Sequence, residues 1–270
     1  MLGRQPKLIT TMKKLFLIVA AMFAAVSFSA CSDDDGGDGK ALTEMRYVKS
    51  IIGDNGSFVQ FDYDQQNRIV KYEYTDNDDS FTYFLTYNGN VVKIMENMKP
   101  NDYNASVQLN SGNNAISVIY YFEGDKGTVN YTYEKGNLTS AKSDDGFIYA
   151  YKWLNGNRYY DANKSVDPDS DKPNVPVLTY TKYNTPKCNV DISTANMFGV
   201  TPPYDLFLGN QSANLPESEI TTHDGRGKDG FKYSYDFDKD GYITKIAIID
   251  FVHVDGYNDE TTYNYTISYY

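Results

Sequence analysis

Three aspartates at alternate positions, Asp236, Asp238 and Asp240, precede Gly241 near the end of the chain. Carboxylates at this spacing can face one side of a turn and supply oxygen ligands to a hard cation such as calcium. An EF-hand would need an acidic residue at the twelfth position of its loop, where this chain has Ala247. The metal hypothesis is therefore a calcium-binding hairpin loop. The alternative, which we favour, is that Asp and Gly here simply suit a tight turn.

Aromatic side chains offer a second kind of site. Trp153 and the many tyrosines could stack on sugar rings, although alternating aromatics on strands mainly pack a core. Nucleophilic catalysis has little support, because Cys188 and the two histidines, His223 and His253, lie in no recognisable motif. A glycan hydrolase that uses paired carboxylates stays open as an alternative, but no spacing singles out a pair.

The aspartates lie in a stretch, residues 231–246, that reads as a β-hairpin. Aromatic residues alternate with polar ones up to Phe237, the chain turns at Asp240-Gly241, and apolar residues resume at Ile243 and Ile246. Alternation with period 2 that is broken by Asp-Gly is typical of two strands joined by a tight turn, with one face wet. We expect Phe231, Tyr233, Tyr235 and Phe237 to face the interior.

The same pattern occurs several times upstream. Four copies end an aromatic arm just before a turn rich in Asn, Asp or Gly, at Tyr63, Tyr87, Tyr133 and Trp153, and a weaker copy turns after Leu109. The gaps between these arm ends are 24, 22, 24 and 20 residues. A period in the twenties indicates an array of one repeated unit, here a hairpin that cannot bury its apolar face without neighbours.

The predicted fold is therefore all-β. It is an antiparallel meander of repeated hairpins, curled into a water-soluble barrel or half-barrel with a Tyr and Phe interior. An insertion of loop and short helix is expected near 161–219, with a strand at 177–183 and helical turns near 194–198 and 205–209. Regular strands resume at Phe231, and the alternating terminal segment 261–269 is expected to pair, closing the sheet if its partner is the first strand.

The net charge argues against a nucleic-acid-binding protein, and the polar face of the strands argues against a transmembrane barrel. The chain has 25 basic and 36 acidic residues, a formal net charge of −11, which repels phosphate backbones and makes nucleic acid an unsuitable partner. A transmembrane barrel needs an apolar band on its outward face. Opposite the aromatics this chain instead carries polar residues: Thr82, Thr86, Asn130, Thr132, Lys232, Ser234, Thr262, Asn264 and Thr266.

The N-terminus indicates export and lipidation. Residues 1–30 have a charged start at Lys13-Lys14 and an apolar core that is too short to be a stable span. The core ends at Phe28-Ser29-Ala30-Cys31, which resembles a bacterial lipobox and implies that Cys31 is the lipidated first residue. Residues 31–43 read as an acidic flexible tether, similar to the export tag of Bacteroidota surface lipoproteins. The expected address is the outer membrane, lipid-anchored and exposed at the cell surface.

Several motifs resemble a known family. The turn formula aromatic-Asp-x-x-Gly/Asn-x-Ile is similar to the YD repeats of Rhs-type shells. Residues 189–192 (NVDI), 205–209 (DLFLG), 212–216 (SANLP) and 235–246 resemble a gut-Bacteroidota surface lipoprotein family of unknown function with a porin-like fold. The likeness covers most of 44–270 and departs at Asn210, where a basic residue is expected. It implies a fold and an address, but no catalytic residues and no cofactor.

These observations predict three segments: a lipoprotein signal peptide (1–30), a tether (31–43) and one β-hairpin-repeat domain (44–270). The expected function is a non-enzymatic binding or structural module tethered to the cell surface, with a glycan or a protein as its ligand. The competing hypothesis is the glycan hydrolase. Two close carboxylates in a cleft, one with a raised pKa, would favour the enzyme, whereas exposed aromatics without them would favour the binder.

Overall fold

The computed structural model describes residues 44–76, 80–96, 103–122, 124–144, 146, 148–161, 176–186, 188–190 and 203–270. The predicted signal peptide, the tether with Cys31 and the helical turn near 194–198 lie outside these residues. Within them, one antiparallel sheet has sixteen strands: β1 (Val48–Gly53), β2 (Phe58–Tyr63), β3 (Ile69–Thr75), β4 (Ser80–Asn88), β5 (Val91–Glu96), β6 (Tyr103–Leu109), β7 (Ala115–Phe122), β8 (Asp125–Glu134), β9 (Asn137–Ser143), β10 (Ile148–Leu154), β11 (Asn157–Tyr160), β12 (Val177–Asn184), β13 (Asn214–His223), β14 (Gly227–Phe237), β15 (Ile243–Val254) and β16 (Tyr257–Tyr269).

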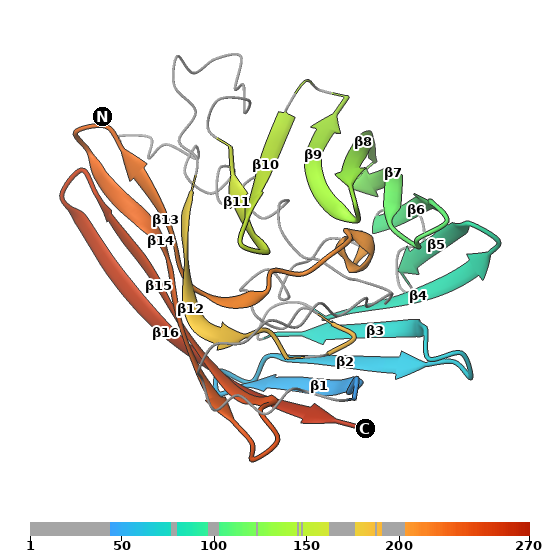
Figure 1. Ribbon diagram of the computed structural model, residues 1–270, viewed down its shortest axis with the longest axis horizontal. Helices are drawn as coiled ribbons and strands as arrows, with labels where there is room; N and C mark the ends of the chain where they lie inside the picture. The colour runs from blue at the N-terminus through green and yellow to red at the C-terminus, as the bar shows by residue number, and fades with distance from the viewer. Residues whose placement is uncertain are drawn as a thin grey trace, which may run out of the picture.

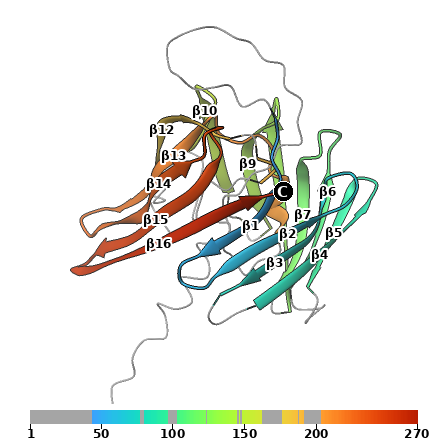
Figure 2. The same ribbon diagram turned by 90° about the horizontal axis from the view of Figure 1, so that it is seen from below.

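The strand order follows the chain with one exception. The sheet runs from β11 down to β1, continues into β16, and then descends to β12 (Figure 1). The terminal strand β16 pairs, as expected, and its partner, which the sequence left open, is the first strand β1, with Ile267 opposite Ile51. The result is a nearly closed all-β barrel. Strands β13–β16 have 10–13 residues and project beyond the shorter strands β1–β3 on one side (Figure 2).

The barrel has a seam between its two edge strands, β11 and β12. Side chains, rather than a backbone ladder, join this seam in the described residues. The Tyr180 hydroxyl donates to the Arg158 carbonyl, and the rings of Tyr159 and Tyr180 meet edge-on at 5.2 Å. Farther along, the Tyr160 hydroxyl donates to Glu219 Oε1 at 3.2 Å. The seam is therefore a polar and aromatic contact.

The core lies on the inner face of the sheet, where alternate residues of each strand point inward. On β4, Tyr83 is 0% exposed whereas its neighbour Phe84 is 42% exposed. The predicted aromatic face of β14, from Phe231 to Phe237, packs on this core. The nine polar residues that were expected to face outward are all partly or fully exposed. The predicted register is therefore confirmed.

A repeated turn explains the sequence formula. The side-chain oxygen of Asp64, Asn110 or Asp238 accepts hydrogen bonds from the backbone N–H groups two and four residues later. The fourth residue of each turn has a positive φ, which is 59° at Asn67 and 87° at Gly241. That conformation favours Asn or Gly, which is why the formula carries one of them at this position.

The arm ends form a second repeated feature. The polar group of an inward aromatic at or next to the end of an arm donates to a backbone carbonyl near the start of the preceding strand. Six such bonds occur in the described residues, made by Tyr63, Tyr87, Tyr133, Trp153, Tyr235 and Tyr269. They gather at the end of the barrel where the repeated turns lie, here called the turn rim. Four of the five arm ends that define the repeat, all except Leu109, make this bond.

A segment between β12 and β13 closes the turn rim. This crossing segment, 185–213 in its described parts, includes one 3-10 turn, η2 (Tyr204–Phe207), which lies inside the arc of strands in Figure 1. Asn189 Nδ2 donates to Tyr63 Oη at 2.9 Å, and the ring of Phe207 lies 6.4 Å from that of Tyr87. The N–H of Asn210 donates to the Gly136 carbonyl at 2.9 Å, and that of Ala213 donates to Gly156.

The predicted insertion is shorter than 161–219. The strand expected at 177–183 is β12, and a helical turn lies near the position expected at 205–209. Strand β13, however, begins at Asn214, before the predicted resumption at Phe231. Its first residues, which include Pro216, show no period-2 alternation, so the sequence pattern did not reveal it. Among the described residues, no helix is long and apolar enough to cross a membrane.

Candidate functional site

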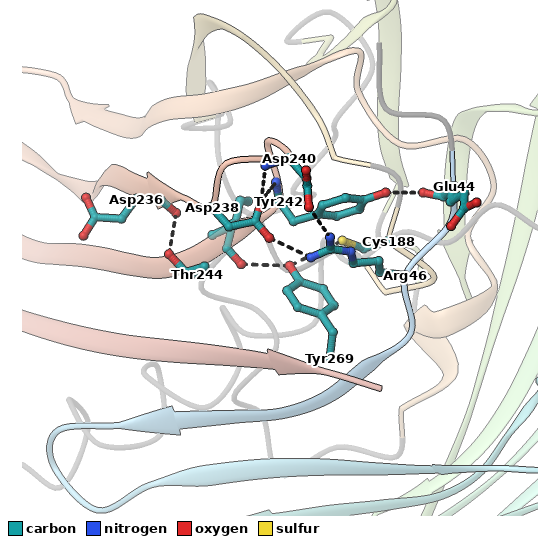
Figure 3. Close-up of polar contacts among 10 residues, drawn as sticks. Glu44, Arg46, Cys188, Asp236, Asp238, Asp240, Tyr242, Thr244 and Tyr269 are labelled. Carbon is teal, nitrogen blue, oxygen red and sulfur yellow. Dashed lines mark hydrogen bonds and ion pairs between the residues drawn. The ribbon is translucent and has the colours of Figure 1, made fainter. Parts of the chain in front are cut away.

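The predicted metal ligands lie beside an arginine. Arg46 Nη1 donates to Asp238 Oδ2 at 2.6 Å and Nη2 donates to Asp240 Oδ2 at 2.9 Å (Figure 3). The guanidinium also lies 3.8 Å from the ring centre of Tyr242 and 5.8 Å from that of Tyr269. Two of the three aspartates therefore already face a cation, which is supplied by the residue that leads into β1.

The third aspartate is separate. The carboxylate of Asp236 points away from the other two in Figure 3, and its backbone carbonyl accepts the Thr244 hydroxyl at 3.3 Å. Burial raises the pKa of Asp238, but the Tyr242 N–H and the Arg46 guanidinium outweigh this effect and lower that pKa overall. Within the described residues, no three His, Cys, Asp or Glu side chains are grouped so that they could hold a metal ion.

The geometry makes a prediction about calcium. We expect the melting temperature to be the same in excess calcium and in chelator, because Arg46 already neutralises Asp238 and Asp240. Arg46→Gln should lower the stability by about 1–2 kcal/mol in both conditions, since the two ion pairs are partly exposed. Thermal unfolding followed by circular dichroism measures both effects. A calcium-dependent rise that Asp238→Ala abolishes would show that the loop binds calcium.

Trp153 lies at an arm end, on the turn rim. Its indole N–H donates to the Leu138 carbonyl at 2.8 Å, and the ring packs on the core while remaining partly exposed. Cys188 is 5% exposed, and its thiol donates to Tyr269 Oη at 3.6 Å. In these contacts both side chains serve packing at the rim.

A different polar cluster lies on the inner face beside the crossing segment. Its members come from three separate parts of the chain: Tyr151, Arg158 and Tyr160 from the β10–β11 hairpin, Asp205 from η2, and Glu219 from β13. The Arg158 guanidinium lies 5.0 Å from the ring centre of Tyr151. Arg158, Asp205 and Glu219 all act electrostatically on Tyr151, so these charges share one neighbourhood.

Burial dominates the titration of this cluster. It raises the pKa of Asp205 to about 7, and the nearby Arg158 guanidinium offsets only part of the shift. Burial also raises the pKa of Glu219, against the opposing effects of Arg158 and of the hydrogen bond from Tyr160. At neutral pH a substantial share of the Asp205 carboxyl groups are therefore neutral and can donate a hydrogen bond.

Sequence reasoning did not find this cluster. Arg158 follows a hairpin turn, Glu219 stands in a strand without alternation, and the three charged residues share no motif. One signal was present, because Asp205 opens the segment 205–209 that carried the family resemblance. Within the same resemblance, Asn210 stands where a basic residue was expected, and its Nδ2 donates to Asn137 Oδ1 at 2.8 Å.

Beyond the cluster, toward the opposite rim, partly exposed aromatics line the inner face. This aromatic band rests on the core and retains solvent contact, and its members are Phe81, Tyr120, Tyr131, Tyr149, Phe231 and Tyr263. By contrast, Phe61 and Tyr83 on the same face are fully buried. Partly exposed aromatics beside a few polar groups are typical of ligand-binding surfaces.

Comparison with known proteins shows a solved structure with a similar fold. No family model and no curated protein sequence match the chain. A solved structure described as a porin-like protein from Bacteroides uniformis ATCC 8492 is similar over 82% of this chain and 96% of its own, with a TM-score of 0.55 and 16% identity. A structure of TcdB2-TccC3-TEV aligns with 76% of this chain and 12% of its own, with a TM-score of 0.29 and 11% identity. At these identities the likeness to the porin-like protein concerns the fold alone.

Proposed function

We propose that this chain is a lipid-anchored, non-catalytic binding protein of the bacterial cell surface that holds a glycan on the inner face of its barrel. The aromatic band carries this proposal. A tyrosine that is half embedded in the core presents a fixed ring face, and such faces match the apolar C–H faces of sugar rings. The polar cluster described above, here called the inner cluster, adjoins this band and supplies the few polar groups that orient a ligand.

Binding is tested with a panel of soluble neutral and acidic polysaccharides in affinity electrophoresis. At least one polysaccharide is expected to retard the chain. Tyr149→Ala should lower the affinity for that polysaccharide by up to about tenfold, because an aromatic contact is worth about 0.5–1.5 kcal/mol. Tyr121→Ala is the matched control, since Tyr121 is 40% exposed on the opposite face of the sheet. Absence of retardation by every polysaccharide would contradict the proposal.

The proposed location, anchored by lipid at the cell surface, rests on the sequence of the predicted signal peptide and tether. Cys31→Ala is expected to release the protein from membranes, and replacing Asp33, Asp34 and Asp35 with Ala is expected to retain it in the periplasm. Protease treatment of intact cells measures the second effect. Equal protection of the wild type and the aspartate variant would rule out display that depends on the acidic tag.

One observation favours the competing enzyme. Asp205 and Glu219 both have raised pKa values, as expected of a general acid. A glycan hydrolase, however, also needs a carboxylate that stays ionised, so the environments of the pair should push their pKa values apart. Here burial raises the pKa of both Asp205 and Glu219, so neither environment favours an ionised carboxylate, and this favours a binding protein over a hydrolase. Release of reducing ends from a retained polysaccharide, lost in Glu219→Gln, would establish the enzyme instead.

A further inference from the structure

Arg158 is the most deeply buried charged group of the inner cluster. The residue is 3% exposed, and its Nη1 atom has no hydrogen-bond partner in the described part of the chain. Its backbone is fixed on both sides, because its N–H donates to Ser212 Oγ at 3.1 Å and its carbonyl accepts from Tyr180 Oη. The backbone of Arg158 is therefore held in place while one donor of its guanidinium stays unsatisfied.

The neighbouring acids do not satisfy this donor. Asp205 and Glu219 are close enough to influence Arg158 through space, but the described residues contain no ion pair between either carboxyl group and the guanidinium. Asp205 Oδ1 is itself buried and without a hydrogen-bond partner. Glu219 instead accepts the hydroxyl of Tyr160. The Nη1 atom of Arg158 and the Oδ1 atom of Asp205 thus lie in one neighbourhood, both buried and both without a hydrogen-bond partner in the described residues.

Burying a cation such as this guanidinium costs free energy of folding unless an anion pairs with it. A carboxylate is the group that matches a guanidinium best, because it accepts two parallel N–H bonds. We propose that the ligand of the inner face is an acidic glycan, whose uronic carboxylate binds Arg158 beside the unpartnered oxygen of Asp205. This inference rests on the proposed function and names its ligand class.

The charges around the site give the sign of its pH dependence. The titratable groups that face it are Tyr133 on β8, Tyr149 and Tyr151 on β10, Arg158 and Tyr160 on β11, Asp205 on η2 and Glu219 on β13. The tyrosines stay neutral near pH 7, because burial raises the pKa values of Tyr133, Tyr151 and Tyr160. Below pH 7 Asp205 is mainly neutral and the cluster can accept an anion. Above pH 7 the ionised Asp205 competes with that anion, so binding takes up a proton.

The test is calorimetry on the full chain in detergent, with oligogalacturonides as the acidic probe and a neutral galactan oligosaccharide of matched length as the control. We expect the acidic probe to bind more tightly at pH 6 than at pH 8, by up to about tenfold for each pH unit above 7 if one proton is taken up. Asp205→Asn should bind at both pH values with little difference. Arg158→Gln should lose at least about tenfold in affinity for the acidic probe, whereas Lys152→Gln, on the outward face of β10, should change nothing.

The outcomes separate this inference from the proposed function. If only the neutral oligosaccharide binds, or both probes bind equally and Arg158→Gln has no effect, the acidic ligand class is wrong while glycan binding stands. If neither probe binds and no polysaccharide of the panel retards the chain, the proposed function fails as well. Should Arg158→Gln not fold, Asp205→Asn decides, because pH dependence that persists in this variant contradicts the role given to Asp205.

Discussion

Replacing Tyr83 with alanine is expected to lower the free energy of unfolding by about 3–5 kcal/mol, the range for removing a buried aromatic from a packed core. Tyr83 is 0% exposed, and its ring lies among those of Tyr72 and Phe81, at centre distances of 6.2 and 6.3 Å. Truncation removes a large apolar area and leaves a cavity that the rigid sheet around it can fill only in part. Urea unfolding of the full chain measures the loss.

The matched control is the next residue of the same strand. Phe84 is also aromatic but points outward and is 42% exposed, so Phe84→Ala should cost less than about 1 kcal/mol. Both variants remove an aromatic ring from β4, so the contrast isolates the face of the sheet from the chemistry of the residue. Similar losses at the two positions would mean that the alternation does not define the core.

This contrast could be predicted because period-2 alternation is a local property. The same holds for the turns, since the oxygen of Asp64 or Asp238 bonds to backbone within four residues, so the turn formula can be recognised along the chain. The repeat spacing reflects bonds such as that from Tyr133 to Ala115, which are also short in sequence. Most strands, the order of the hairpins and the inward face therefore followed from the sequence, whereas β13, whose first residues do not alternate, did not.

Partners that are distant in the chain could not be predicted. The aspartates of 236–240 suggested a metal because nothing nearby in sequence indicates that Arg46 lies against them. The inner cluster needs Arg158, Asp205 and Glu219 to meet from three separate segments, and only the barrel and its crossing segment bring them together. Such contacts depend on closure of the sheet, which local patterns do not encode.

The second prediction concerns a circularly permuted chain, and it follows from the pairing of β1 with β16 that closes the sheet. The N–H of Tyr270 donates to the Tyr47 carbonyl at 3.0 Å, so the end of β16 lies beside the entry to β1. A permutant can therefore begin at Pro176, run to Tyr270, continue through a short Gly-Ser linker to Glu44 and end at Asp161. The strands of the permutant then run from β12 to β16 and on from β1 to β11. In this order each strand follows directly after the strand beside it in the sheet.

We expect the permutant to keep the barrel with a melting temperature within a few degrees of that of the original chain. Its new termini lie at the seam, where the described residues form no backbone ladder that could be lost. It should also refold faster, since the β1–β16 pairing changes from the longest-range contact in the sheet to a local one. Stopped-flow refolding measures the rate. As the control, a chain that ends at Gly256 loses β16 and exposes the edges of both β15 and β1, so it should not fold cooperatively. A permutant that fails to fold while the original chain refolds would show that the covalent link across the seam, rather than the β1–β16 pairing, holds the barrel together.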